Sequence, residues 1–318
     1  MLSPTPAQSS PETFEPGWKL VTAKAAWQPR DSMGYVAFRN RLWILGGWFD
    51  SGSPCPRDVW SSADGCHWEL ELREAPWRHS DFPICLVFRD RMWVMGGWYN
   101  GRLPYCEAGN EVWSTGNGYD WSRTPDKAAW SPRVGAAGII FRNKMWIFGG
   151  VEKYFAGDES HLKNDVWYSE NGETWDLVTH TAAWSPRAFH QSVVFDDKLW
   201  ILGGGNYLPN YKAFNDVWCS EDGVNWHQVT GEAPWSERLW FAAVAYRDRL
   251  WIMGGWSNDP FQDYNDVWHS KDGVTWTRLE SETVWSKRHA QAAYVFDDKL
   301  WIAGGHARPL SNEVWRLG

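Results

Sequence analysis

The sequence predicts an all-β fold built from six similar units, each made of four strands. The first observation is a double glycine that recurs six times and always follows a short apolar run. The second is the regular spacing of these pairs along the 318 residues, with intervals of 50, 53, 54, 51 and 50 residues. The third is that the first and last units are incomplete and complementary. The glycine pairs begin at Gly46, Gly96, Gly149, Gly203, Gly254 and Gly304.

The fourth unit shows the order of elements that we expect in all six. An apolar run ending at Phe195 forms strand a, and a polar turn leads into strand b, KLWILGG at 198–204. Strand c follows as DVW at 216–218, and an SEDG turn leads to strand d, which begins near Trp226. β-branched and aromatic residues between Gly, Asn and Asp turns are typical of strands and hairpins.

The two ends of the chain indicate how the units close into one domain. In every complete unit a second Trp follows the strand-d Trp after nine residues, and Trp18 and Trp27 show the same interval without strands a to c before them. The last unit stops after strand c, at Leu317. We therefore expect the N-terminal strand to complete the last unit, which removes two open sheet edges. Residues 1–16 are expected to be a tail and residues 17–318 a single domain.

These units resemble kelch repeats over residues 18–318. The resemblance rests on the double glycine that closes strand b, the aromatic residue of strand c, the Trp eight residues later and the Pro-Arg pair before strand a. The chain looks like a bacterial-type, Trp-rich kelch propeller of the galactose-oxidase-like kind. The resemblance implies a six-bladed β-propeller with four strands per blade around a central channel, in which the N-terminal strand completes the last blade.

Composition argues against several classes of protein. The net charge of −8 disfavours nucleic-acid binding, which needs a basic surface. No run reaches the ~20 apolar residues of a membrane-spanning helix, so no membrane contact is predicted. Residues 1–17 lack the apolar segment of a secretory signal, so we expect a cytoplasmic monomer, or an exported one if a signal peptide was removed. Cys55 and Cys106 lie in loops of adjacent blades, and whether they pair is left open.

Tryptophan is the most unusual feature of the composition, with 28 residues. One Trp position in each of strands b, c and d, and one in the d–a connection, recur in all six blades and account for 24 of the 28. We expect these 24 to pack within and between blades. The Trp residues outside the repeat are Trp48, Trp98, Trp240 and Trp256.

Length variation predicts which face of the propeller binds a ligand. From the second glycine to the strand-c Trp the interval is 13, 16, 17, 14, 13 and 10 residues in blades one to six, whereas the other intervals are constant. The b–c loops share one face with the d–a connections, and variable loops on a rigid scaffold are typical of recognition. We predict that this face binds a small molecule (a sugar, or an aromatic or cationic ligand) or a peptide segment. The candidate ligand-binding residues are Trp48, Trp98, Trp240, Trp256, Phe241, Phe189, Tyr99, Tyr154, Arg288 and His306.

Two charged positions also recur on this face. Five blades carry an Arg before strand a, where blade two has Ser80, and all six blades carry a carboxylate at the start of strand c. The simpler interpretation is an ion pair that anchors each blade, and the alternative is an anion-binding ring at the channel mouth. The residues are Arg30, Arg133, Arg187, Arg238 and Arg288, with Asp58, Glu111, Asp165, Asp216, Asp266 and Glu313.

A small-molecule enzyme on the same face is the alternative function. Kelch-type sialic acid epimerases and mutarotases imply His, Arg and Glu side chains that act as acid and base. A metal-dependent lyase is a second enzymatic version, although the Glu-x3-Asp-x3-His run of kelch proteins that steer glucosinolate breakdown does not occur in this sequence. No cofactor is predicted, and a divalent metal is a secondary hypothesis. The catalytic candidates are His190, His289, Glu237 and Arg187, and the candidate metal ligands are His190, His289 and His306.

Overall fold

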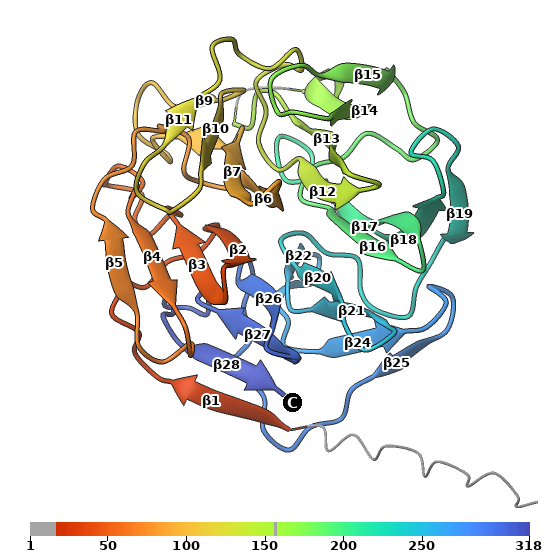
Figure 1. Cartoon of the computed structure of the whole chain (residues 1–318). Coiled ribbons are helices and arrows are strands. Elements are labelled where there is room, and N and C mark those ends of the chain that lie inside the picture. The colour runs from red at the N-terminus through yellow and green to blue at the C-terminus, as the bar shows by residue number, and fades with distance from the viewer. Residues whose placement is uncertain (1–16, 156–157) are drawn as a thin grey trace, which may run out of the picture.

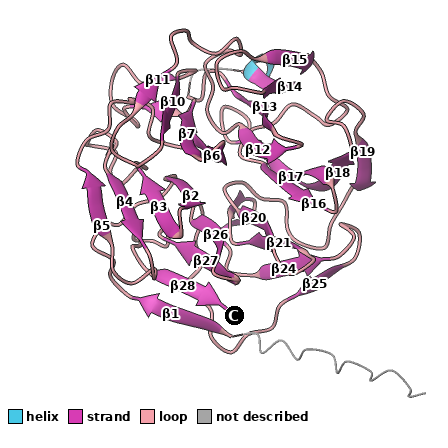
Figure 2. Ribbon diagram, viewed as in Figure 1, coloured by secondary structure: helices cyan, strands magenta, loops and turns pink. Residues whose placement is uncertain are grey.

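The computed structural model describes residues 17–155 and 158–318, so the predicted tail lies outside the described residues. Within them, six four-stranded antiparallel sheets stand as blades around a central axis (Figure 1). The six-bladed propeller with four strands per blade is therefore confirmed. Strands and loops make up almost all of the described chain, and one turn of 3-10 helix, η1 (Glu159–His161), lies between β13 and β14 (Figure 2).

In every blade the strands follow one another outward from the channel in the order a, b, c, d. Strand b is buried along nearly its whole length because each blade packs between two others, which explains its continuous apolar run. Strand a is β2 (Gly34–Phe38), β6 (Ile84–Phe88), β12 (Ala137–Phe141), β16 (Gln191–Phe195), β20 (Ala242–Ala245) and β26 (Ala292–Phe296). Strand b is β3 (Arg41–Leu45), β7 (Arg91–Met95), β13 (Lys144–Val151), β17 (Lys198–Asn206), β21 (Leu250–Met253) and β27 (Lys299–Ala303). Strand c is β4 (Val59–Ser62), β10 (Val112–Thr115), β14 (Leu162–Ser169), β18 (Lys212–Ser220), β24 (Val267–Ser270) and β28 (Val314–Leu317). Strand d is β5 (Glu69–Leu72), β11 (Ser122–Arg123), β15 (Asp176–Thr179), β19 (His227–Thr230), β25 (Trp276–Arg278) and β1 (Trp18–Thr22).

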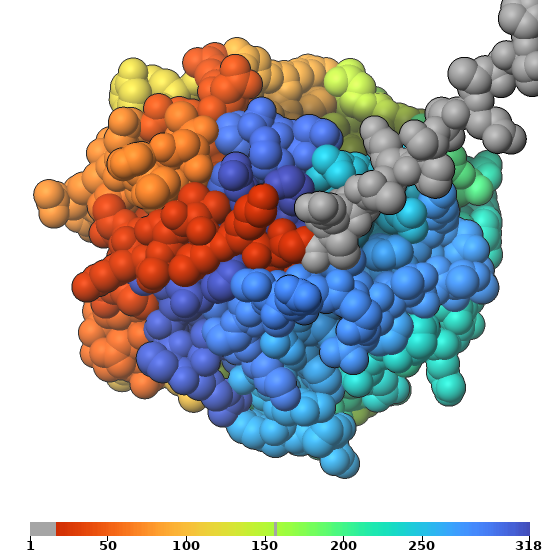
Figure 3. Space-filling view, turned by 90° about the horizontal axis from the view of Figure 1, so that it is seen from below, coloured from red at the N-terminus to blue at the C-terminus, as the bar shows by residue number. Residues whose placement is uncertain are grey.

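The ring closes through strand β1, as predicted. β1 pairs antiparallel with β28, with Trp18 opposite Leu317 and Leu20 opposite Trp315. Figure 3 shows the red N-terminal segment lying against the blue C-terminal segments. The last blade is thus made from both ends of the chain.

The repeating Trp residues form the contacts that hold each blade. The Trp of each d–a connection is fully buried and meets the strand-d Trp of the blade that it leads into, edge to face. The ring centroids are 5.8 Å apart for Trp77 and Trp121, and 6.2 Å apart for Trp184 and Trp226. Such pairs contribute roughly 0.5–1.5 kcal/mol each beyond the area that they bury.

The turn between strands c and d makes a contact between neighbouring blades. Gly223 in this turn has a φ of 77°, and a Cβ atom there would lie 2.3 Å from Cζ3 of Trp146 in the preceding blade. A side chain is therefore excluded both by the left-handed backbone and by the indole. The equivalent glycines that lie against a strand-b Trp are Gly65, Gly118, Gly172 and Gly273.

The recurring arginines anchor the blades, which confirms the simpler of the two interpretations. Arg133 is fully buried and donates two hydrogen bonds to the Asp165 carboxylate, at 2.6 and 2.9 Å, and one to the carbonyl of Gly149. Asp165 also accepts a hydrogen bond from Trp167 Nε1. Arg288, a candidate ligand-binding residue, is equally buried and makes the same kind of pair. The other pairs are Arg30–Asp58, Arg187–Asp216, Arg238–Asp266 and Arg288–Glu313.

The b–c loops form ordered walls on one face. Blades two and five carry extra hairpins there, β8 (Trp98–Tyr99) with β9 (Glu107–Ala108), and β22 (Trp256–Asn258) with β23 (Phe261–Asp263). In blades three and four, strands b and c instead continue past the double glycine. These walls enclose the candidate site.

Candidate functional site

A hoop of six equivalent residues surrounds the channel mouth on the loop-bearing face. Each lies two positions after the anchoring Arg or its counterpart and has a positive φ between 51° and 66°. The left-handed backbone turns the chain inward, where backbone N–H groups donate to the neighbouring blade: Ser32 N to Ala290 O at 3.0 Å, and Phe82 N to Ser32 O at 2.8 Å. The hoop residues are Ser32, Phe82, Gly135, Phe189, Trp240 and Ala290.

Three large hoop side chains meet across the axis. The ring centroid of Phe82 lies 5.2 Å from that of Phe189 and 6.4 Å from that of Trp240, and Phe189 and Trp240 are 5.6 Å apart. Below them lies the channel, a cavity of about 280 Å³ lined largely by strand-a residues. Above them lies a second cavity of about 230 Å³, which we call the cup. Phe82 and Trp240 form walls of both cavities.

The cup lies among the d–a connections and the b–c loops. One side of its wall is aromatic and the other carries ionisable groups. It is lined by Asp31, Ser32, Trp48, Asp81, Phe82, Gly101, Arg102, Tyr154, Phe155, Tyr207, Trp240, Trp256, Phe261, His289, His306 and Arg308.

The division of the wall follows from one position of the repeat. The residue directly before each hoop residue pairs through its backbone with the residue that directly follows the double glycine in the same blade. Asp31 pairs in this way with Trp48, and His289 with His306. In blades six, one and two this residue is ionisable, and in blades three, four and five it is apolar. The six residues in blade order are Asp31, Asp81, Val134, Ala188, Leu239 and His289.

Five rings form a continuous row along the cup. Trp48 stacks on His306 at 6.3 Å between centroids, and His306 stacks on His289 at 4.9 Å with 16° between the planes. His289 lies 5.1 Å from Trp240, which lies 5.1 Å from Trp256. The two imidazoles are therefore held between indoles, with their polar atoms at the ring edges.

Carboxylates orient both imidazoles. Nδ1 of His306 lies 3.1 Å from Asp31 Oδ2, and Nδ1 of His289 lies 2.5 Å from Asp263 Oδ1. The second oxygen of Asp263 accepts a hydrogen bond from Arg308 Nε at 2.6 Å. Burial by itself raises the pKa of Asp263, but the hydrogen bonds and charges of His289 and Arg308 outweigh it and hold that pKa below its ordinary value.

Asp81 is the most unusual ionisable group of the cup. Its side chain is buried, and Oδ1 has no hydrogen-bond partner among the described residues. Burial raises the pKa of Asp81 well above its ordinary value, and the nearby charge of Asp31 raises it further, against the opposing effects of Ser32 and Arg102. A buried acceptor without a partner is costly unless something else supplies a hydrogen-bond donor.

The family follows from the repeats themselves. A family model described as the KLHDC2/KLHL20/DRC7 Kelch-repeats domain matches residues 84–305, more than half of the chain. The chain belongs to the kelch-repeat family. This kelch propeller is 29% identical over 139 residues to alpha-scruin of Limulus polyphemus, an alignment that covers 42% of the chain and 14% of alpha-scruin. It is 26% identical over 140 residues to kelch repeat protein M-T8 of Myxoma virus (strain Lausanne), covering 43% of the chain and 25% of that protein.

Other similarities concern the repeat and the fold. The kelch propeller is 29% identical over 157 residues to the flagellar outer-arm dynein alpha chain of Chlamydomonas reinhardtii, covering 43% of the chain and 3% of that protein. The matched segments thus span a quarter or less of these curated relatives. The solved structure of YjhT superposes with a TM-score of 0.73 at 14% identity, covering 93% of this chain and 96% of YjhT, which shows a shared fold. No helix in the described part of the kelch propeller is long and apolar enough to cross a membrane.

The kelch propeller brings some of the candidate residues together and separates others. Trp48, Trp240, Trp256, Tyr154, His289 and His306 line the cup. Phe189, Phe241 and His190 line the channel below it.

The remaining candidates lie outside both cavities. Trp98 is buried under the cup wall, where its Nε1 donates to Gly101 O at 2.7 Å. The Tyr99 ring lies under the Arg78 guanidinium, 4.2 Å from the ring centroid. Arg187 is held by Asp216, and Glu237 is exposed with a pKa raised by partial burial and by nearby carboxylates.

Sequence reasoning missed four ionisable residues of the cup: Asp31, Asp81, Arg102 and Arg308. Two of them carried a readable signal. Asp31 and Asp81 follow directly on the anchoring position, where three other blades have apolar residues. Comparing the residue at this position in all six blades would have distinguished blades six, one and two from the other three. Arg102 and Arg308 lie in loops of unequal length, so they have no equivalent positions in the other blades with which to be compared.

The cysteines do not crosslink the cup walls. All five cysteines lie within the described residues and are free, including Cys55 and Cys106, whose pairing the sequence left open. Cys55 is buried near Gly101 and Cys106 is half-buried. The loop geometry of the cup therefore rests on packing and hydrogen bonds.

Proposed function

We propose that this kelch propeller binds a small molecule in the cup, through stacking on the aromatic wall and hydrogen bonds to the ionisable wall. The single observation that carries the proposal is the division of one cavity between these two kinds of wall. Ligand sites usually combine an apolar lining with a few convergent polar groups. A volume of about 230 Å³ lies below the roughly 300–1,000 Å³ of sites for drug-sized molecules. The ligand is therefore about as large as a monosaccharide or a small aromatic amine.

The chemistry of the polar wall favours a ligand that donates hydrogen bonds. Asp81 Oδ1 lacks a donor, and Asp31 faces the same cavity. Sugar hydroxyls or an ammonium group supply such donors, while the hydrophobic face of a sugar or an aromatic ring stacks on indole. A peptide segment that inserts one side chain meets the same requirements. The partner is thus a small molecule or a peptide segment, and we propose that a monomer binds it.

A second candidate function is proton transfer to and from such a ligand. The observation that favours it is the hydrogen bond that Nδ1 of His289 donates to the Asp263 carboxylate, which orients the imidazole and leaves Nε2 for the cup. A carboxylate that orients a histidine is the usual arrangement of a general acid–base pair. Isomerisation of a sugar is the reaction class that this pair supports.

The test is a binding screen with monosaccharides, acidic sugars and aromatic amines, measured by saturation-transfer NMR and then by calorimetry. We expect Trp48→Ala and Phe261→Ala to weaken the Kd of a bound compound by about tenfold or more, because both rings line the cup and Phe261 is 63% exposed. Tyr119→Ala is the matched control, since Tyr119 is 52% exposed on a c–d turn of the opposite face.

Equal Kd values in all three variants would refute the cup as the site, as would a screen in which nothing binds below ~1 mM. The NMR spectra also follow the ligand over time. If the wild-type protein converts the ligand to an isomer, and His289→Gln still binds the ligand but no longer converts it, the second candidate function is favoured.

A further inference from the structure

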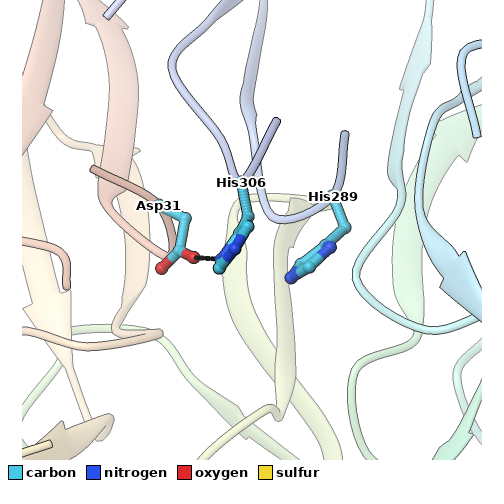
Figure 4. Close-up of side chains that lie close together, drawn as sticks. All are labelled: Asp31, His289 and His306. Atoms are coloured by element: carbon cyan, nitrogen blue, oxygen red, sulfur yellow. Dashed lines mark hydrogen bonds and ion pairs between the residues drawn. The ribbon is translucent and has the colours of Figure 1, made fainter. Parts of the chain in front are cut away.

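Three potential metal ligands converge where the first and last blades meet. Asp31 lies between β1 and β2, His289 precedes β26, and His306 follows β27. One polar atom from each of them lies within 4.8 Å of the other two, and this is the one such group of three among the residues that the structure describes. Figure 4 shows them in a row, with Asp31 hydrogen bonded to His306 and His289 on the far side.

The donor set matches the preferences of first-row divalent cations. Two imidazoles and one carboxylate suit Zn²⁺, Co²⁺ or Ni²⁺, whereas Mg²⁺ and Ca²⁺ prefer oxygen ligands throughout. Asp31 is almost fully buried and His306 is about one-third exposed, so the group is open to the cup on one side. This leaves an open coordination position toward the cavity.

The surroundings of the group are those of a supported metal site. Asp263 accepts from Nδ1 of His289, and metal-binding histidines commonly bond a carboxylate through the nitrogen that does not face the metal. Arg308 holds the second oxygen of Asp263 in turn. Asp81, nearly fully buried with an unpartnered Oδ1, lines the same cavity and adds a second carboxyl beside Asp31.

We propose that Asp31, His289 and His306 bind one divalent cation of the first transition row, with Zn²⁺ as the reference ion. The cation takes the place of the proton between His306 Nδ1 and Asp31 Oδ2, and that proton leaves to solvent. Because the two imidazole planes differ by only 16°, their lone pairs lie in two nearly parallel planes about one stacking distance apart, so one ring turns to aim at the ion. His306, the more exposed of the two, has the room to do so.

The test titrates the metal-stripped full chain, without an affinity tag, with Zn²⁺ by calorimetry and with Co²⁺ by absorption spectroscopy. We expect one ion per chain with a micromolar or lower Kd, and little heat with Mg²⁺. His306→Gln should weaken Zn²⁺ binding by at least tenfold, and Asp263→Asn by roughly 10–100-fold through His289. Near-ultraviolet circular dichroism establishes that each variant is folded, and Asp31→Asn replaces any variant that is not.

His67→Gln is the matched control, because His67 and Asp64 form an exposed histidine–carboxylate pair at 2.7 Å on a c–d turn. This variant should retain the parent Kd. The proposal is overturned if the parent binds no Zn²⁺ below about 0.1 mM, if His306→Gln binds as tightly as the parent, or if His67→Gln loses as much. Since the ion itself is the probe, the result is independent of whether an organic ligand is found.

Discussion

A histidine in the channel shows how burial sets the state of a single side chain. His190 packs against Trp184 with 5.7 Å between ring centroids, and neither of its ring nitrogens has a hydrogen-bond partner among the described residues. Burial, and to a lesser extent the charge of Arg187, lowers the pKa of His190 to about 3. The folded chain therefore holds this imidazole neutral, whereas the unfolded chain protonates it below about pH 6.5.

This difference makes stability depend on pH in a predictable direction. A lowered pKa in the folded state means that unfolding takes up a proton, so the free energy of unfolding falls as pH drops below about 6.5 and levels off near 3. His190→Gln removes this contribution. The free energy of unfolding of the variant minus that of the parent should therefore be about 2 kcal/mol larger at pH 5 than at neutral pH.

Urea denaturation of both proteins between about pH 7.5 and 5 measures the effect. His227→Gln serves as the control, because His227 is exposed on strand β19. Its curve should run parallel to that of the parent. If the His190→Gln curve is parallel as well, His190 is not held neutral in the folded chain.

At the residue scale the sequence predicted packing better than chemistry. The recurring Trp and Arg positions were identifiable because the six blades share one packing environment, so residues with the same structural role repeat at equivalent positions. The cup depends on residues that differ between blades, such as Asp31 in blade one, whose equivalent in blade five is Leu239. A single sequence shows that such residues differ, but their distances arise only when the ring closes.

At the scale of elements, the c–d turn links each blade to the one before it. The hydroxyl of Ser220 accepts from the backbone of Gly223, and the Asp222 carboxylate accepts from the backbone of Val224 and Asn225. This fixes the turn, and Gly223 then lies flat against Trp146. The SxDG motif is therefore a contact between blades as much as a hairpin turn. Its turn role was predictable, whereas its neighbour in space was not.

Gly223→Ala should destabilise the propeller by about 2–4 kcal/mol, because it adds left-handed backbone strain and pushes a methyl group into the Trp146 indole. Chemical denaturation with fluorescence detection measures the change. Gly231→Ala is the control, since a Cβ there meets its nearest atom, on Gln228, at 3.5 Å. That variant should be as stable as the parent or slightly more so. Similar losses in both would show that the contact with Trp146 contributes little.

At the scale of the whole molecule, one strand decides whether the ring is closed. β1 supplies the outer strand of the last blade, and Trp18 packs edge to face on Trp285 at 5.9 Å. Without β1, β28 is an unpaired edge next to an exposed core. The six-bladed count and this closure were both predictable, because the nine-residue interval marked the displaced strand.

Trp18→Ala should cost about 3–5 kcal/mol and promote aggregation on heating, because Trp18 is only 2% exposed and fixes the closing strand. Thermal unfolding with light scattering measures both effects. Leu20→Ala, two residues along the same strand and 46% exposed, should cost under about 1 kcal/mol. Equal melting temperatures for the two variants would mean that the ring does not depend on this strand.

The pairing of Asp31 with His306 has a consequence for biosynthesis. These two residues are separated by 275 positions, so the first is synthesised long before the second. Blades two to five can form while the ribosome is still translating the remainder. The polar wall of the cup, however, is assembled only after His289 and His306 of the last blade have emerged. The inner blades can therefore be complete before Asp31 meets His306, and this wall of the cup forms after them.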